Sequence, residues 1–272
     1  MKQVRPKKNL GQHFLTDLQV ARRIADTVDA QPDLPVLEVG PGMGVLTQFL
    51  LAKERPLKVV EIDDESVSYL RRAYPTLEDG IVADDFLKMR LEHTFGGQPF
   101  VLTGNYPYNI SSQIFFKMLD YRALIPCCTG MIQKEVADRL AAAPGSKAYG
   151  ILTVLVQLYY DVEYLFTVEP GVFNPPPKVR SAVVRLRRND RTAPDCDERL
   201  FKRVVKTTFN RRRKMLRGSI KPLLAELSHE RTCIGDIESF LGEESMTKRP
   251  EQLSIADFIA LTNRVETLFA KP

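Results

Sequence analysis

Short apolar segments alternate with helix-like segments over the first half of this 272-residue chain. Strand-like runs occupy residues 36–39, 57–62, 80–83, 100–103 and 127–132, and helix-like runs occupy 45–52, 64–73, 110–119 and 133–142. A chain that alternates in this way pairs its strands in parallel and covers both faces of the sheet with helices. The first half is therefore predicted to form a parallel α/β sheet.

The second half changes character twice. Residues 161–168 and 181–186 are β-branched runs, joined by a proline-rich turn at 174–177 with no helix between them. An antiparallel pair at one end of the sheet is the simplest arrangement of such runs. After Asn189 helical periodicity takes over at 198–207, 222–227 and 254–269, with Ser254 and Asp257 as a capping pair. We therefore predict two domains, residues 1–188 and a small all-α domain at 189–272.

Positive charge is concentrated at the start of the predicted helical domain. Residues 187–217 contain twelve Lys or Arg against four Asp or Glu, a net charge of +8, whereas the whole chain carries +5 and the remainder therefore −3. The densest part is a run of four cations, Arg211, Arg212, Arg213 and Lys214. Basic runs are often only solvated surface, but so uneven a distribution favours a face that binds the phosphates of a nucleic acid.

Several classes of protein do not fit this composition. The richest apolar run, residues 148–160, includes Gln157 and is shorter than the roughly 18 residues of a membrane span. The basic N-terminus has no apolar signal region, which argues against export. The four cysteines lack the spacing of a disulfide framework and only three histidines are present, so we expect no metal site and a reduced, cytoplasmic setting.

A glycine-rich loop, residues 38–44, lies where the first strand meets its helix. Glycines at such a turn let the backbone approach a ligand closely. A dinucleotide site would have a third glycine at position 45, where this chain has Val45, and this departure counts against NAD. Glu38, which opens the loop, suits a cationic ligand, and S-adenosylmethionine (SAM) carries a sulfonium and an ammonium group but no phosphate.

An acidic residue ends the second predicted strand. Glu61 comes 21 residues after Gly40. This is close to the ~20-residue spacing at which a carboxylate reaches the ribose hydroxyls in nucleotide-binding α/β folds. Asp63 and Asp64 are alternatives, but they lie past the strand and begin the next helix. Glu61 is therefore the predicted ribose ligand.

A further acidic pair follows the third predicted strand. Asp84 and Asp85 are placed where a carboxylate would accept a hydrogen bond from the adenine amino group, and Asp85 has the better position. The adjacent Phe86 or Leu87 would flank the adenine ring.

The tetrad Asn105-Tyr106-Pro107-Tyr108 follows the fourth predicted strand. The Asn105 side-chain oxygen and the Pro107 carbonyl offer two acceptors for the hydrogens of a planar amine such as the exocyclic nitrogen of adenine. Tyr108 would stack on the target base, which must leave its own stack to enter such a site. The opposite face of the base would take a second ring from one of two candidates, Phe115 or Phe173.

The N-terminal residues 9–15, from Asn9 to Leu15, are too mixed for a linker. We expect them to fold over the cofactor, with Gln12 or His13 reaching its polar groups and Leu15 covering an apolar surface.

Together, and in this order, these motifs resemble the ribosomal small-subunit RNA adenine dimethyltransferases. Residues 173–184, 209–216 and 249–253 resemble further signatures of that family, so the resemblance spans nearly the whole chain. It implies a Rossmann-like SAM-dependent methyltransferase sheet with an antiparallel end pair, followed by a small helical domain that binds rRNA. The implied reaction is dimethylation of N6 of two adjacent adenines near the 3′ end of 16S rRNA, in the small ribosomal subunit or its precursor. A cytoplasmic monomer with a role in subunit biogenesis is expected.

The resemblance also assigns residues by matched position. Six would contact SAM: His13, Leu15, Gly40, Glu61, Asp85 and Asn105. Asn105, Pro107 and Tyr108 would be catalytic, and the run from Arg211 to Lys214 would bind RNA. The sequence departs from the family pattern at three positions: Tyr106 replaces a smaller aliphatic residue, His13 an asparagine and Arg180 an aspartate.

Three other functions share parts of this pattern. A large-subunit rRNA adenine methyltransferase of the macrolide-resistance type has the same loop and tetrad, but residues 173–184 and the C-terminal signature favour the small-subunit group. A DNA adenine methyltransferase would need a target-recognition domain that is not evident. A non-catalytic RNA-binding assembly or transcription factor on the same fold would not need the glycine loop, Glu61 and Asn105 intact.

Overall fold

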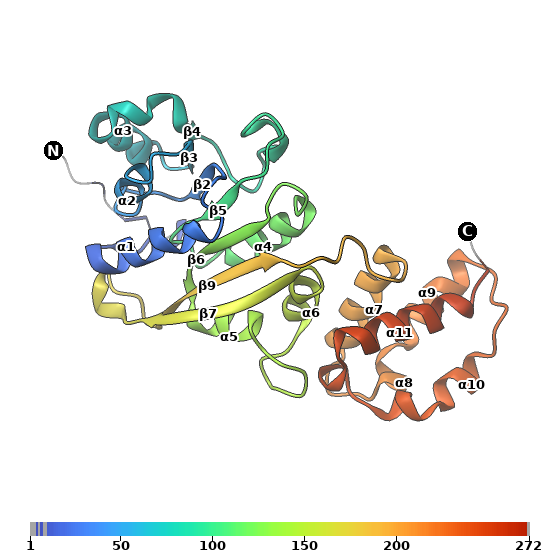
Figure 1. Ribbon diagram of the computed structural model, residues 1–272. Coiled ribbons are helices and arrows are strands. Elements are labelled where there is room, and N and C mark those ends of the chain that lie inside the picture. Colours follow the sequence, from blue (N-terminus) through green and yellow to red (C-terminus); the bar gives the residue numbers. More distant parts are fainter. Residues whose placement is uncertain (1–3, 5, 8–9, 271–272) are drawn as a thin grey trace. The chain divides into compact units, whose positions relative to one another are not determined.

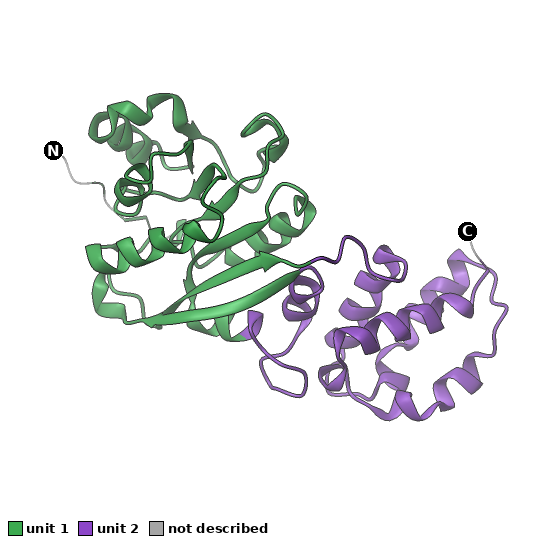
Figure 2. Ribbon diagram, in the orientation of Figure 1, with its two compact units in different colours: residues 1–138, 160–189 green, residues 139–159, 190–272 purple. Residues whose placement is uncertain are grey.

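The computed structural model describes residues 4, 6–7 and 10–270. The chain forms two compact units, one of residues 1–138 and 160–189 and the other of residues 139–159 and 190–272 (Figure 2).

The first unit is built on a mixed sheet, which has seven strands within the described residues, in the order β4-β3-β2-β5-β6-β9-β7 (Figure 1). Its parallel part contains β2 (Val36–Val39), β3 (Leu57–Glu61), β4 (Ile81–Ala83), β5 (Val101–Thr103) and β6 (Cys127–Gln133). The antiparallel end pair is β9 (Ser181–Arg188), which pairs with β6, and β7 (Tyr160–Val168) at the edge. The predicted Rossmann-like sheet with an antiparallel end pair is confirmed.

Both faces of this sheet are covered. Successive strand residues point to opposite faces, and the residues on each face are buried. Val36, Val59, Val101 and Cys127 share one core with Ala21, Ile24 and Ala25 of α1. Their neighbours in the strands face the other side and are also buried. The helices of this unit are α1 (Leu18–Asp26), α2 (Thr47–Leu51), α3 (Asp64–Ala73), α4 (Ser111–Asp120) and most of α5 (Lys134–Leu140), whose last two residues fall in the second unit.

Short 3₁₀ turns complete the first unit: η2 (Thr27–Ala30), η3 (Pro75–Gly80), η4 (Leu91–His93) and η5 (Pro170–Val172).

The predicted helix at 64–73 is found with the same bounds, and its start is fixed by Asp63, whose side chain accepts from the Ser66 N–H. α1 was not predicted. Its N-terminus is capped by Asp17, which accepts from the N–H groups of Gln19 and Val20.

A second, two-stranded sheet in the described residues was also not predicted. β1 (Phe14–Leu15) pairs antiparallel with β8 (Phe173–Asn174), with Leu15 opposite Phe173. This pairing ties the N-terminal segment to the proline-rich segment, although the two are far apart in the sequence. The N-terminal segment is thereby fixed along the first unit.

The second unit is helical, with α6 (Ile151–Gln157), α7 (Glu198–Asn210), α8 (Leu216–Ser219), α9 (Lys221–Glu230), α10 (Ile237–Gly242), η6 (Glu244–Thr247), η7 (Pro250–Gln252) and α11 (Ile255–Thr267). Its core joins α7 to α11 through aromatic rings, with Phe209 and Phe258 stacked at 5.7 Å between centroids. The expected cap at α11 is present: the Ser254 hydroxyl accepts from the Asp257 N–H, and the Asp257 carboxylate accepts from the Ser254 N–H.

The second unit includes a segment that the sequence analysis placed in the first domain. The chain passes between the units at Asn189, one residue after the expected boundary, but residues 139–159 also belong to the helical unit. The Tyr149 ring lies 6.0 Å from that of Phe209, and Arg212 hydrogen-bonds the carbonyls of Ser146 and Lys147. These contacts are between residues more than 50 positions apart, so local sequence gives no sign of them.

Candidate active site

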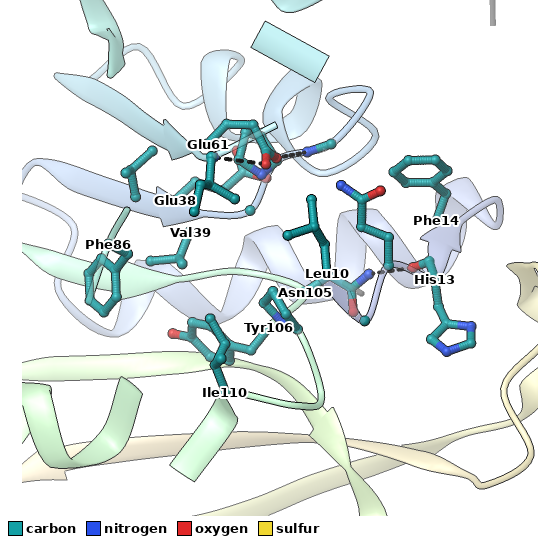
Figure 3. A pocket seen from close by; sticks show the side chains of 18 of the residues that line it. Leu10, His13, Phe14, Glu38, Val39, Glu61, Phe86, Asn105, Tyr106 and Ile110 are labelled. Atoms are coloured by element: carbon teal, nitrogen blue, oxygen red, sulfur yellow. Dashed lines mark hydrogen bonds between the residues drawn. The ribbon is translucent and has the colours of Figure 1, made fainter. Parts of the chain in front are cut away.

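A pocket opens at the carboxyl ends of β2, β3, β4 and β5, in the first unit (Figure 3). In an open α/β sheet ligands bind at this edge, where the strand order reverses, and here the reversal falls between β2 and β5. The lining comes from five segments, residues 10–15, 38–46 without Gly44, 60–62, 84–87 and 105–110. All six residues expected to contact SAM line this one pocket, as do Pro107 and Tyr108. Their individual contacts with the cofactor stay predictions.

The glycine loop requires backbone conformations that other residues rarely adopt. Gly40 has φ of 68°, and its N–H donates to the Val60 carbonyl at 2.9 Å, which joins the loop to β3. Gly44 has φ of 77°, and a Cβ there would lie 2.3 Å from the Tyr74 ring. The Tyr74 hydroxyl also donates to the Gly44 carbonyl at 2.9 Å. The loop is therefore shaped by contacts from outside as well as by its own glycines.

Glu61 is held rigidly at the end of β3. One carboxylate oxygen accepts from the Gly42 N–H at 3.0 Å, and the other accepts from the N–H groups of Ile62 and Asp63, each at 3.0 Å. Burial raises the pKa of Glu61, and these backbone donors act against that rise. The oxygen bonded to Gly42 keeps an open lone pair, which fits a ribose hydroxyl.

Glu38 is the second buried acid at this edge, and only 1% of its surface is exposed. It accepts a hydrogen bond from the Thr47 hydroxyl at 2.7 Å. Burial raises the pKa of Glu38 to about 8, and the neighbouring Glu61 adds to the rise. Without a ligand the carboxyl is therefore mostly protonated at neutral pH, and a cation in the pocket would favour its ionised form.

The side of the pocket that is predicted to hold the adenine ring is formed by the loop after β4. Asp85 lines the pocket and accepts from the Leu87 N–H at 3.0 Å, while its other oxygen lies 3.4 Å from the Lys88 ammonium. Phe86 is nearly buried. Ile62, also in the lining, is 53% exposed and offers an apolar surface that the sequence analysis missed.

The tetrad follows β5, and its first side chain has a defined orientation. The Asn105 amide nitrogen donates to the His13 carbonyl at 3.0 Å. Because only the amino end of a carboxamide can donate, the Asn105 side-chain oxygen must point the other way. Figure 3 shows this bond, with the amide lying beside the lined cavity. The oxygen is therefore turned away from the His13 carbonyl, and its role as an acceptor for a target amine stays a prediction.

The rest of the tetrad is also anchored. The Pro107 carbonyl accepts from the Ile110 N–H at 3.2 Å and retains a second lone pair. The Tyr108 hydroxyl is hydrogen-bonded to that of Ser181, and the Tyr108 ring lies 5.4 Å from the His13 ring. Burial raises the pKa of Tyr108, so it stays a neutral ring at physiological pH.

Tyr106, one of the departures from the family pattern, has a core position. It is 1% exposed, and its hydroxyl donates to the Thr129 carbonyl at 2.9 Å. Its ring meets that of Phe115 edge-on at 6.1 Å. Phe115 and Phe173, the two candidates for a second stacking ring, are buried and do not line the pocket. Phe14, which was not suggested as a stacking ring, does line it, together with Phe86, Tyr106 and Tyr108.

Residues 10–15 of the N-terminal segment line the pocket, and the contacts of His13 and Leu15 with the cofactor stay predictions. The His13 ring is hydrogen-bonded to the Pro175 carbonyl at 2.8 Å. The backbone carbonyl of His13 accepts from the Asn105 amide. Leu15 is buried in β1, and Gly11 lies so close to Asn109 that a Cβ would be 2.6 Å from its side-chain oxygen. Asn9 lies outside the described residues.

The predicted RNA-binding run divides into two kinds of residue. Arg211, Arg213 and Lys214, hereafter the basic turn, are exposed after the end of α7. Arg212 is instead hydrogen-bonded to the carbonyls of Lys147 at 2.8 Å and Ser146 at 3.0 Å. The guanidinium of Arg212 therefore holds the 143–148 loop within the helical unit.

Three further observations concern the membrane, metal-binding and disulfide-containing classes of protein. No helix within residues 10–270 is long and apolar enough to cross a membrane. Over the same described range, no three His, Cys, Asp or Glu side chains gather as a metal site would require. All four cysteines fall in the described part of the chain and are free thiols.

The fold, the glycine loop, Glu61 and the Asn-x-Pro-aromatic tetrad are those of a SAM-dependent methyltransferase, and comparisons with known proteins give the same class. The sequence profile of the family described as ribosomal RNA adenine dimethylase matches residues 3–260. Two relatives named ribosomal RNA small subunit methyltransferase A, from Bacteroides fragilis and Bacteroides thetaiotaomicron, are 66% and 67% identical over 100% and 98% of this chain and 96% of each relative. The chain belongs to the ribosomal RNA adenine dimethylase family.

Solved structures agree with this assignment. A dimethyladenosine transferase from Plasmodium falciparum superposes with a TM-score of 0.78 at 26% identity, covering 94% of this chain and 99% of that one. The 23S rRNA methyltransferase ErmE gives 0.62 at 28% identity, covering 93% and 99%. The small-subunit relatives are far more similar in sequence than this large-subunit enzyme, so the macrolide-resistance alternative is not favoured.

Proposed function

We propose that this protein transfers methyl groups from SAM to N6 of two adjacent adenines near the 3′ end of 16S rRNA, in the small ribosomal subunit or its precursor. The observation that carries the proposal is the orientation of Asn105. Its amino group is occupied by the His13 carbonyl, which leaves its oxygen as an acceptor beside the pocket that contains Glu61. A target amine held by that oxygen would lie next to the cofactor site.

The residues around the pocket fit SAM. Glu61 would bind the ribose hydroxyls through its open lone pair, and Asp85 the adenine amino group. Glu38 would balance the positive charge of the ligand, since its buried carboxyl gains stability as an anion only when a cation is near. When bound, SAM supplies a methyl group on a positively charged sulfur.

The tetrad would activate the amine through hydrogen bonds. The lone pair of an adenine amine is delocalised into the ring, which makes it a weak nucleophile. Asn105 and the Pro107 carbonyl would accept its two hydrogens, and both bonds strengthen as the nitrogen gains positive charge in the transition state. Tyr108 would hold the base flat, because Ser181 fixes its hydroxyl. The proton is lost to solvent after transfer, since the methylated nitrogen is acidic.

A second methylation needs only one of these acceptors. The monomethylated amine keeps a single N–H, so one of the two oxygens is released while the other still orients the nitrogen. The amine must rotate its methyl group away from the sulfonium before the second transfer. Dimethylation is thus compatible with a pair of acceptors on one side of the base.

Removal of the Asn105 amide tests this function. Asn105→Ala should lower kcat by about 10²–10³-fold, the usual loss for one oriented hydrogen-bonding group, while calorimetry should show SAM affinity changed much less. Asn263→Ala is a matched control, because Asn263 also donates its amide to a carbonyl, that of Asp195, but lies in the helical unit.

The assay should use small subunits from cells that lack this methylation, with radiolabelled methyl groups mapped on the rRNA. Equal rates for Asn105→Ala and the parent protein would show that Asn105 has no catalytic role. Label confined to large-subunit RNA would refute the proposed substrate.

The basic turn would contact rRNA phosphates and orient the substrate without reading its bases. We further propose that the protein works as a cytoplasmic monomer, which light scattering on the purified protein and cell fractionation would test.

A further inference from the structure

One lysine links the adenine side of the pocket to the helix that follows the tetrad. The Lys117 ammonium, on α4, donates to the carbonyls of Leu87 at 3.1 Å and Met89 at 2.6 Å. Both carbonyls belong to residues 84–89, hereafter the adenine loop, which carries Asp85 into the pocket. We propose that Lys117 is a positioning residue for the adenine ring of the cofactor, an inference that rests on the proposed function.

The adenine loop does not fix these carbonyls by itself. Within the loop, the Leu87 N–H donates to the Asp85 carboxylate at 3.0 Å, and the N–H groups of Lys88 and Met89 donate to the Asp85 carbonyl. These bonds use the loop's own donors and curl it around Asp85. The carbonyls of Leu87 and Met89 then point to a donor from another element, which Lys117 supplies with one charged group.

α4 connects this loop to the target-amine acceptors. The helix follows the Ile110 N–H that bonds the Pro107 carbonyl, and Lys117 lies two turns further on, roughly 10 Å along the axis. One short helix therefore fixes both the acceptors for the amine and the loop for the adenine ring. Methyl transfer depends on alignment of these two groups, which makes a rigid connection between them useful.

The surroundings keep Lys117 in place. Its ammonium lies 5.6 Å from the centre of the Phe86 ring and 5.3 Å from that of Tyr121. Burial lowers the pKa of Lys117, and the Asp85 carboxylate is the first of several that oppose this shift. Hydrogen bonds from a partly desolvated cation are stronger than those on an open surface.

The test compares Lys117→Met, which keeps the apolar stem but removes the donors, with Lys117→Arg, which retains donors. Two ligands are titrated by calorimetry: S-adenosylhomocysteine, and S-inosylhomocysteine, in which a carbonyl oxygen replaces the adenine amino group. Lys58→Met is the matched control, because the Lys58 ammonium also lies 5.6 Å from a phenylalanine ring, Phe95, but neither residue lines the pocket.

Lys117→Met should bind S-adenosylhomocysteine about tenfold more weakly, the loss expected when the hydrogen bond between Asp85 and the adenine amino group is no longer formed. Its affinity for S-inosylhomocysteine should fall much less, so the preference for the adenine ligand shrinks. Lys117→Arg should restore most of the preference, and Lys58→Met should match the parent protein.

Two results would overturn the inference. Lys117→Met with parental affinities and preference would show that the lysine does not position the loop for adenine. Equal losses for both ligands would assign Lys117 to fold stability alone. Failure of the proposed function would look different, because the parent protein itself would then bind neither ligand or methylate no adenine.

Discussion

Replacing Glu38 by glutamine should stabilise the protein without cofactor, by an amount that grows with pH. The folded protein keeps Glu38 protonated up to a pKa of about 8, whereas the ordinary value is 4.5. A raised folded-state pKa contributes stability that is complete below pH 4.5 and is lost as the pH rises toward 8. Glutamine resembles the protonated acid at every pH, so the variant does not suffer this loss.

The size of the effect follows from the two pKa values. At pH 7, which is 2.5 pH units above the ordinary pKa of 4.5, Glu38 of the parent must take up a proton when the protein folds. This uptake costs about 3 kcal/mol. At pH 5 the same uptake costs less than about 1 kcal/mol. The glutamine oxygen can still accept from the Thr47 hydroxyl, as Glu38 does. However, its amino group must also find a partner, so we expect a net gain of about 1–3 kcal/mol at pH 7.

Urea unfolding of Glu38→Gln and of the parent at pH 5, 6, 7 and 8, without SAM, measures the gap directly. The free-energy difference should widen steadily across this series. A constant difference, or one that narrows, would refute the claim that a buried neutral carboxyl is present. With saturating SAM the advantage of the variant should shrink at pH 7, because the bound cation stabilises ionised Glu38 in the parent alone.

Two further perturbations probe the surface and the loop. Charge reversal of the basic turn should weaken binding to small subunits and lower the steepness of log K against log salt by roughly two. The control variant Arg212→Met should leave that slope nearer the parental value. An unchanged slope in both variants would show that the basic turn is solvated surface that does not contact RNA. Gly44→Ala should lower the free energy of unfolding by roughly 2–4 kcal/mol, from its positive φ and its clash with Tyr74. In the same denaturation assay Gly242→Ala should change little, since a Cβ there meets nothing within 4 Å, and equal stabilities for both variants would contradict the strain argument.

The sequence predicted those parts of the molecule that depend on local pattern. The parallel strands were evident from short apolar runs, and the helix at 64–73 from its periodicity, with Asp63 as the cap that starts it. Glu61 could be placed in the pocket because its distance from the glycine loop along the chain is set by one strand-helix-strand unit. The pocket was therefore predictable as a set of residues at one sheet edge.

Geometry that depends on distant pairs could not be predicted in this way. The Asn105 orientation is set by the His13 carbonyl, 92 positions away, and the role of Arg212 by carbonyls 65 and 66 positions away. Phe115 and Phe173 were suggested as stacking rings on residue type alone, but both are core residues. The partner of a backbone carbonyl and the face on which a side chain is buried cannot be inferred from composition. The orientation of Asn105, the role of Arg212 and the burial of the two rings therefore required the structure.

The pairing of β1 with β8 has a consequence for how the protein matures during its own synthesis. Phe14 and Leu15 are among the first residues made, yet their partners, Phe173 and Asn174, are made only after all the residues of the parallel strands. A nascent chain can thus assemble the parallel strands while one wall of its pocket still lacks its anchor. The amide of Asn105 donates to the His13 carbonyl in that wall, so its orientation depends on where the wall lies. Catalytic competence would then arrive as a late event in translation, after the scaffold has formed.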